Sequence, residues 1–143
     1  MSVIGPELPG ARVVDLFAGS GALGLEALSR SAEHITFVER AGAARRVLEA
    51  NIAMLGAGSE VEVVSDDVFR FLRRGSGTMW DIALADPPYG GDLAARLVTM
   101  FREEPFARLL CVEHRRDDAL DLPDDADQRR YGDTVLTFLH TDR

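Results

Sequence analysis

The sequence of 143 residues has no lysine, a single cysteine and no long apolar run. The lone Cys111 excludes a disulfide framework and a cysteine-based zinc site, and its apolar neighbours predict a buried small side chain in a strand. A membrane-spanning helix would need about 20 apolar residues in succession. The N-terminus also lacks the charged start and apolar stretch of a signal peptide. We therefore expect a cytoplasmic protein that does not enter a membrane.

Positive charge is scarce as well. The chain has 16 basic and 24 acidic residues, which gives a net charge of −8, and six of the aspartates fall in the segment 117–127. This balance excludes a protein whose whole surface attracts a polyanion. Because every basic residue is an arginine, any phosphate contact must come from a guanidinium group, which favours planar, bidentate pairing. Candidates are Arg115, Arg116, Arg129 and Arg130, with ordinary solvated side chains as the alternative.

Metal ligands are also few. The three histidines, His34, His114 and His140, are scattered along the chain without the spacing of a metal site. We therefore predict no bound metal and interpret each histidine as structural.

The remaining pattern alternates short apolar runs with helical periodicity, which predicts one domain over residues 1–143 with a short lead-in at 1–11. Strands are predicted at 12–16, 35–38, 61–64, 81–85 and 109–112. Helices are predicted at 22–29, 43–55 and 92–101, with a shorter one near 68–72. The residues expected on the inner faces are Ala22, Leu25 and Leu28 in the first helix, Leu48, Ile52 and Leu55 in the second, and Val68, Phe71 and Leu72 in the short one.

Alternating strands and helices of this kind form a parallel sheet with helices on both faces. The C-terminal segments Asp127–Tyr131 and Thr134–Leu139 differ, because only Gly132 and Asp133 separate them. No crossover helix fits between them, so they should pair as an antiparallel hairpin at one sheet edge. The predicted fold class is α/β and Rossmann-like, with seven strands, mostly parallel, and the last strand inserted antiparallel.

A glycine-rich turn joins the first predicted strand to the first helix, between Asp15 and Gly24. Glycines let the backbone approach a ligand closely, and the free N–H groups at the start of the helix point into the crevice. Read as Gly-x-Gly-x-x-Gly, the turn also matches the dinucleotide fingerprint, with Glu39 at the distance expected for a carboxylate that holds a ribose. It predicts a nucleotide-type ligand, with a simple tight turn as the alternative.

Acidic side chains follow the second and third strands at their carboxyl ends, where ligands of open α/β sheets bind. Glu39 can accept hydrogen bonds from two adjacent ribose hydroxyls; the alternative is a solvated helix cap before Ala41. After the third strand, a carboxylate of Asp66 or Asp67 can accept from an adenine amino group while Val68 packs on the ring. The alternative role, capping of the following helix, suits Asp66 better than Asp67.

The most informative segment is Asp86-Pro87-Pro88-Tyr89, which follows the fourth strand. Successive prolines fix φ and remove backbone donors, so their carbonyls are presented as unpaired acceptors. The preceding carboxylate adds an acceptor, and the following aromatic ring adds a stacking surface. Such a site fits a planar heterocycle with an exocyclic amino group, which donates to Asp86 and to the Pro87 carbonyl while Tyr89 stacks on the ring. The alternative is a surface turn.

Together these segments resemble the bacterial 16S ribosomal RNA guanine-N2 methyltransferases, within the larger class of amino-methyltransferases that carry an (Asn/Asp)-Pro-Pro-(Tyr/Phe/Trp) motif. The matching pieces cover nearly the whole chain from Val14 onward: Val14–Arg30, Phe37–Glu39, Asn51, Asp67, Asp86–Tyr89, Val112–His114 and Arg130–Thr134. The first piece and the Tyr-Gly-Asp-Thr element are fairly specific to this group, whereas Asp-Pro-Pro-Tyr is shared with DNA adenine methyltransferases. Members of the group have a further N-terminal segment before the first strand, where only about a dozen residues are found here.

The resemblance implies a Rossmann-like class I methyltransferase, a transferase that uses S-adenosyl-L-methionine and releases S-adenosyl-L-homocysteine. It implies rRNA processing by rRNA methylation at the N2 amino group of a guanine, with RNA binding and with 16S ribosomal RNA or the small ribosomal subunit as the partner; we expect a monomer. The residues implied for cofactor binding are Asp15, Phe17, Ala18, Gly19, Ser20, Gly21, Glu39, Arg40, Asp67, Val68 and Asp86. The residues implied for the target base are Asp86, Pro87, Pro88 and Tyr89.

Three other interpretations remain open from the sequence. A nicotinamide-dependent oxidoreductase would explain the glycine pattern but leaves the Asp86–Tyr89 motif unexplained. A protein that binds the cofactor without acting on RNA is suggested by the short N-terminus. An N6-adenine DNA methyltransferase, or an amino-methyltransferase of a small molecule, would keep the chemistry and change the substrate.

Overall fold

The computed structural model describes residues 4–75 and 79–141. The strands in these ranges are β1 (Arg12–Leu16), β2 (His34–Val38), β3 (Val61–Val64), β4 (Trp80–Ala85), β5 (Ala107–Arg115), β6 (Asp127–Tyr131) and β7 (Thr134–His140). The helices are α1 (Ala22–Ser29), α2 (Gly42–Leu55), α3 (Val68–Arg74) and α4 (Leu93–Glu103), with short 3₁₀ turns η1 (Gly5–Glu7) and η2 (Gly58–Glu60). The predicted lead-in contains η1, and its residues 1–3 lie outside the described ranges.

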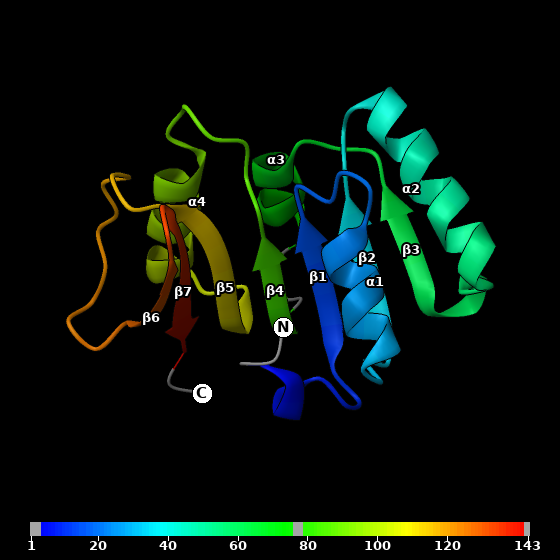
Figure 1. Cartoon of the computed structure of the whole chain (residues 1–143), viewed down its shortest axis with the longest axis horizontal. Helices are drawn as coiled ribbons and strands as arrows, with labels where there is room; N and C mark the ends of the chain where they lie inside the picture. Colours follow the sequence, from blue (N-terminus) through cyan, green and yellow to red (C-terminus); the bar gives the residue numbers. More distant parts are fainter. Residues whose placement is uncertain (1–3, 76–78, 142–143) are drawn as a thin grey trace.

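The strands form one sheet in the order β3-β2-β1-β4-β5-β7-β6 (Figure 1). The first five strands are parallel, because the connections between them return the chain to the same end of the sheet. Strand β7 lies between β5 and β6 and is antiparallel to both. The predicted seven-stranded sheet with an antiparallel C-terminal hairpin is confirmed.

Helices cover both faces of the sheet and divide the core in two. Helices α1 and α2, with η1, pack on one face against side chains such as Val13, Ile35 and Phe37. Helices α3 and α4 pack on the other face, where Val14 and Leu110 belong to the second cluster. Strands β1, β2 and β4 read as nearly continuous apolar runs because both of their faces are buried, whereas β3 lies at the sheet edge and is only partly buried.

The structure corrects some of the predicted inner faces of the helices. Leu55 is 63% exposed and Ala22 is also exposed, so neither belongs to the core. Both are terminal residues of their helices, where the apolar pattern continues past the turn that contacts the sheet. In α3 the buried pair is Val68 and Phe69. Its other two apolar residues, Phe71 and Leu72, were predicted to lie on the inner face but are only half-buried.

Strand β5 is longer than predicted, since it continues through Glu113, His114 and Arg115 in pairing with β7. The polar side chains of this extension obscured it in the sequence. His114 is buried and shares a hydrogen bond with Thr137 on β7, which fits its structural interpretation. Cys111 is half-buried in the same strand, and burial raises the pKa of its thiol to about 12. Within the described residues, none of the helices combines the length and apolar character that a bilayer span requires.

Candidate active site

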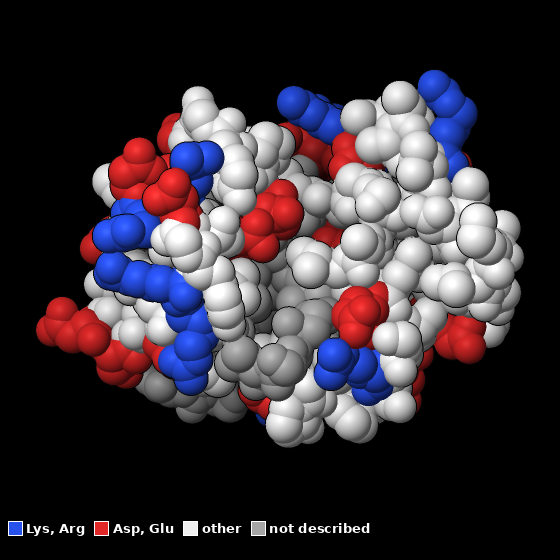
Figure 2. All heavy atoms as spheres, in the orientation of Figure 1, with Lys and Arg blue, Asp and Glu red and all other residues white. Residues whose placement is uncertain are grey.

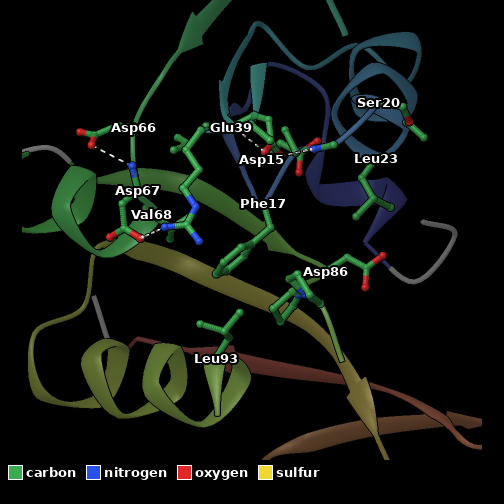
Figure 3. A pocket seen from close by; sticks show the side chains of 18 of the residues that line it. Asp15, Phe17, Ser20, Leu23, Glu39, Asp66, Asp67, Val68, Asp86 and Leu93 are labelled. Carbon is green, nitrogen blue, oxygen red and sulfur yellow. Dashed lines mark hydrogen bonds and ion pairs between the residues drawn. The ribbon is translucent and has the colours of Figure 1, made fainter. Parts of the chain in front are cut away.

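A crevice of about 660 Å³ opens at the carboxyl ends of the central strands (Figure 3). It brings together residues that follow β1, β2, β3 and β4, as expected for ligand sites of open α/β sheets. The predicted site residues that line it are Asp15, Phe17, Ala18, Gly19, Ser20, Glu39, Arg40, Asp67, Val68, Asp86, Pro87, Pro88 and Tyr89. Gly21 lies behind this wall. The glycine loop after β1 and the Pro-Pro turn after β4 therefore face one shared crevice.

Asp15 is the most deeply buried acid of the crevice, with 1% of its surface exposed. Its Oδ2 accepts a hydrogen bond from the Gly24 amide at 3.0 Å, which ties the end of β1 to the first turn of α1. Burial, opposed by the Gly24 hydrogen bond and assisted by the charges of Asp86 and Glu39, raises the pKa of Asp15 to about 8. A cation placed in the crevice would stabilise the ionised form of this carboxyl.

The glycine loop has a shape that side chains would block. Gly21 has a φ of 86°, and a Cβ at this position would lie 2.3 Å from Leu48 Cδ1 on α2. A Cβ at Gly24 would lie 2.4 Å from Phe37 Cε1 on β2. The loop thus lies close to α2 and β2, while Phe17, with a φ of 57°, lines the crevice.

Glu39 anchors the loop from the end of β2. Its Oε1 accepts from the Gly19 amide at 2.8 Å, and its Oε2 accepts from the Ala41 amide at 3.0 Å. The second bond ends at Ala41, which is itself the N-cap residue of α2, so Glu39 does not take the helix-capping role that was its alternative. Asn51 fixes the same loop from α2 by donating to the Ser20 carbonyl at 2.9 Å. Asn51 belongs to the motifs that resemble the methyltransferase family, but the sequence alone predicted no role for it.

The structure reverses the capping assignment that the sequence favoured for the two aspartates after β3. Asp67 caps α3 by accepting from the Arg70 amide at 3.0 Å, and Asp66 does not. Asp66 instead accepts from the Asp67 amide and pairs with Arg74. Capping uses one oxygen of Asp67, and its other oxygen lies 3.8 Å from Arg40 (Figure 3).

The Asp86–Tyr89 turn supplies unpaired acceptors on the opposite wall. No hydrogen bond within the described residues ends at the carbonyl of Pro87 or Pro88. Partial burial and the charge and hydrogen bonding of Glu113 raise the pKa of Asp86 to about 6. Tyr89 is 48% exposed, so its ring is accessible to a ligand.

Glu113 and Arg115, at the end of β5, complete the surroundings of this turn. The Tyr89 hydroxyl donates to Glu113 Oε2 at 3.1 Å. The Arg115 guanidinium lies 5.2 Å from the centre of the Tyr89 ring, so this candidate for phosphate binding also packs on the aromatic side chain. The sequence alone predicted no role for Glu113. The parallel pairing of β4 with β5, which the alternating pattern predicts, places Glu113 beside Asp86.

The other candidate phosphate contacts lie near the C-terminal hairpin. Arg116, Arg129 and Arg130 are exposed, and Arg129 forms an ion pair with Asp127 at 2.6 Å. Figure 2 shows arginines as a band over the part of the molecule where Figure 1 places β6 and β7, beside a hollow with acidic side chains. Within the described ranges, 4–75 and 79–141, no cluster of three or more metal-ligating side chains occurs.

Comparison with known proteins places the chain among methyltransferases. The model of the family described as "Conserved hypothetical protein 95" matches residues 1–140. YlbH of Bacillus subtilis, described as an rRNA methyltransferase, is 34% identical over 145 residues, which cover 98% of this chain and 75% of that protein. Ribosomal RNA small subunit methyltransferase D of Escherichia coli is 38% identical over 100 residues, 70% of this chain; the match spans half of that relative's length.

Solved structures agree with this placement. A protein of Haemophilus influenzae described as a methylase superposes with a TM-score of 0.82 at 28% identity, over 96% of this chain and 90% of its own. A protein of Escherichia coli described as a methyltransferase gives 0.79 at 28% identity, over 96% and 78%. A methyltransferase complexed with S-adenosylhomocysteine gives 0.70 at 17% identity, over 95% and 48%, which is a likeness of fold. The fold is thus that of the Rossmann-like class I methyltransferases.

Proposed function

The chain belongs to the family described as "Conserved hypothetical protein 95", and from this membership we propose that it transfers a methyl group from S-adenosyl-L-methionine to the N2 amino group of a guanine in 16S ribosomal RNA. Its relatives include ribosomal RNA small subunit methyltransferases, in agreement with the family resemblance of its motifs. One observation carries the proposal: the Asp86–Pro87 acceptors lie across a single crevice from the glycine loop. The protein acts as a single domain and a monomer, in the cytoplasm, with 16S RNA or the small subunit as its partner.

The residues of the crevice fit S-adenosyl-L-methionine. Its volume of about 660 Å³ lies within the range typical of small-molecule sites. The buried carboxyl of Asp15 and the backbone of the glycine loop hold the methionine portion, which carries a cationic amino group. Glu39 would hold the ribose, and Asp67 and Val68 would hold the adenine; all three line the crevice, with Arg40 close to Asp67.

The acceptor wall prepares the amino group for attack. When bound, the cofactor supplies an electrophilic methyl group on a sulfonium sulfur. An aromatic amino group is a poor nucleophile, because its lone pair is delocalised into the ring. Asp86 and the Pro87 carbonyl accept hydrogen bonds from the two N–H groups of the amino group. This directs the nitrogen lone pair toward the glycine-loop side of the crevice. Such alignment can contribute about 7–11 kcal/mol to the lowering of the barrier.

Asp86 also stabilises the positive charge that develops on the nitrogen. With a pKa of about 6, most of this carboxyl is ionised at neutral pH. Tyr89 stacks on the base, which must be flipped out of a duplex or already unpaired. Because the acid needs to accept hydrogen bonds rather than remove a proton in advance, a strong base is not required.

The decisive experiment measures methyl transfer from radiolabelled S-adenosyl-L-methionine in three parallel reactions, with deproteinised 16S RNA, assembled small subunits and DNA. Label in RNA, recovered as N2-methylguanosine after nuclease digestion, supports the proposal. Label in DNA as N6-methyladenine would replace it by the adenine alternative. Cofactor binding without methyl transfer to any of the three substrates would support the alternative that the protein binds the cofactor but does not act on nucleic acid.

A further inference from the structure

Glu113 lies beside Asp86 because of the register of the sheet. Strands β4 and β5 are parallel, and their last paired residues are Ala85 and Val112. Asp86 and Glu113 are the next residues on each strand. Neighbours in register on parallel strands project from the same face of a sheet, so the two carboxyl groups project side by side at the carboxyl edge.

No basic side chain neutralises this pair. Among the ion pairs that the described residues form, none includes Asp86 or Glu113. Arg115 packs on the Tyr89 ring, and the Tyr89 hydroxyl occupies only Oε2 of Glu113. The mutual repulsion of the two acids contributes to the raised pKa of Asp86. Two carboxyl groups held together without a cation form a site for a ligand with two adjacent hydrogen-bond donors.

A small second pocket borders the crevice at this point. It has a volume of about 110 Å³ and is lined by Glu113 and otherwise by apolar residues: Ile4, Leu23, Leu84, Ala85, Cys111, Leu136 and Phe138. Leu23 lines both cavities, and Glu113 lines the small pocket while its Oε2 accepts a hydrogen bond from Tyr89 of the main crevice. Glu113 is therefore the only charged residue in the described lining of the small pocket, at its border with the acceptor wall.

We propose that Glu113 is the specificity-determining residue of the acceptor site, where its free oxygen accepts the ring N–H of guanine while Asp86 accepts from the adjacent amino group. The inference rests on the proposed function and deepens it. The Watson–Crick edge of guanine carries the ring N1–H next to the N2 amino group, which are two donors side by side. Adenine and cytosine carry an acceptor nitrogen next to their amino group. A carboxylate offers acceptors only, so those bases would face it with a lone pair.

The Tyr89 hydroxyl fixes the orientation of the carboxylate that makes this selection. By donating to Oε2, Tyr89 holds the Glu113 side chain in one orientation, in which Oε1 remains for the base. The same residue supplies the ring on which the base stacks. Rejection of a base that leaves such an acceptor unpaired is strong, because an unsatisfied polar group in a closed site is costly.

The test uses 2-aminopurine, which has the amino group of guanine at the same ring carbon but an unprotonated ring nitrogen beside it. Full-length 16S RNA is assembled by splinted ligation with either guanine or 2-aminopurine at the methylated position. This RNA is presented either as naked RNA or assembled into small subunits, depending on which form the enzyme methylates. The kcat/KM for each base is measured with the wild-type protein, with Glu113→Gln and with the matched control Glu103→Gln. Glu103 is exposed at the end of α4.

The wild-type protein and the control should prefer guanine by about 10- to 100-fold. Glu113→Gln, whose amide can donate to the unprotonated nitrogen, should reduce this preference to about threefold or less, with an unchanged Kd for the cofactor. A wild-type preference near one, or an unchanged preference in Glu113→Gln, would refute the role of Glu113 while methylation itself continues. Absence of transfer to guanine by the wild-type protein would instead refute the proposed function, and the inference with it. The unchanged Kd for the cofactor checks that Glu113→Gln is folded, so its base preference can be compared with that of the wild-type protein.

Discussion

At the scale of single residues, the proposed function divides the site into a wall for the cofactor and a wall for the target base. Asp86 belongs to the second wall and lies at the border with the first. Replacement Asp86→Ala removes the acceptor that aligns the amino group, so kcat should fall by at least about 100-fold. The Kd for S-adenosyl-L-methionine, measured by calorimetry, should stay within a few-fold of the wild-type value.

The matched control for this variant is Asp92→Ala, six residues further along the chain at the start of α4, where the side chain makes no capping hydrogen bond. It should leave both kcat and Kd nearly unchanged. Normal turnover in Asp86→Ala would remove Asp86 from the reaction, and a large loss of cofactor affinity would assign it to the other wall.

Asp15 predicts how the stability of the unliganded protein depends on pH. Its pKa in the folded state, about 8, lies above the value of about 3.9 in an unfolded chain. Between these values the folded state holds a proton that the unfolded state has released. The contribution to the free energy of unfolding is therefore fully present below pH 4 and is lost as the pH rises through about 8.

Urea denaturation at several pH values tests this dependence through Asp15→Asn, which keeps the shape and removes the charge. Relative to the wild type, the variant should become progressively more stable as the pH rises from about 5 to about 8.5. Asp124→Asn, at an exposed position, should instead follow the wild-type curve. Parallel curves for Asp15→Asn and the wild type would show that the pKa of Asp15 is not raised.

At the scale of elements, the glycine loop depends on how closely α2 and β2 approach it. Gly21→Ala places a methyl group against Leu48 and forces a left-handed backbone on an alanine, so the free energy of unfolding should fall by about 1–3 kcal/mol. Gly58→Ala, where an added Cβ meets no atom within 4 Å, should change it by less than about 0.5 kcal/mol. Chemical denaturation of both variants checks the difference; equal effects would mean that the loop can move away from Leu48.

The elements also show what the sequence could predict. Apolar runs located β1 to β4 within a residue or so, because both faces of β1, β2 and β4 are buried and the valines of β3 pack partly against the same two clusters. The same rule failed for the end of β5, because Glu113 and Arg115 are polar yet pair with β7. The crevice was predictable, since parallel strands bring their carboxyl ends to one edge. The side-chain roles of Asp66 and Asp67 were not, because either aspartate has the chemistry to cap α3 and only the geometry decides.

At the scale of the whole molecule, the distribution of charge limits how RNA is held. Because the chain has a net charge of −8, it offers the proposed RNA substrate few attractive contacts, and the band of arginines near the hairpin is the candidate for them (Figure 2). The dependence of log K on log salt concentration for RNA binding should therefore be shallow, with a slope no steeper than about −4. Filter binding between low and physiological salt measures it.

Two variants locate the contacts behind this slope. Combined replacement of Arg116 and Arg130 by alanine should make the slope shallower by about 1–2. Arg108→Ala, at the opposite end of β5, should leave it unchanged, since Arg108 pairs with Asp81 there. A steep slope that survives the double replacement would place the RNA on another surface.

The position of β7 has a consequence for the order in which the protein matures on the ribosome. All strands that carry the cofactor wall, β1 to β4, have been synthesised once the chain reaches Ala85. Strand β5, which carries Glu113, acquires its outer neighbour only when β7 is translated, because β7 inserts between β5 and β6. A nascent chain can thus form the proposed cofactor wall early. The proposed base-selecting wall, which includes Glu113, lacks the neighbouring strand β7 until β7 has been translated.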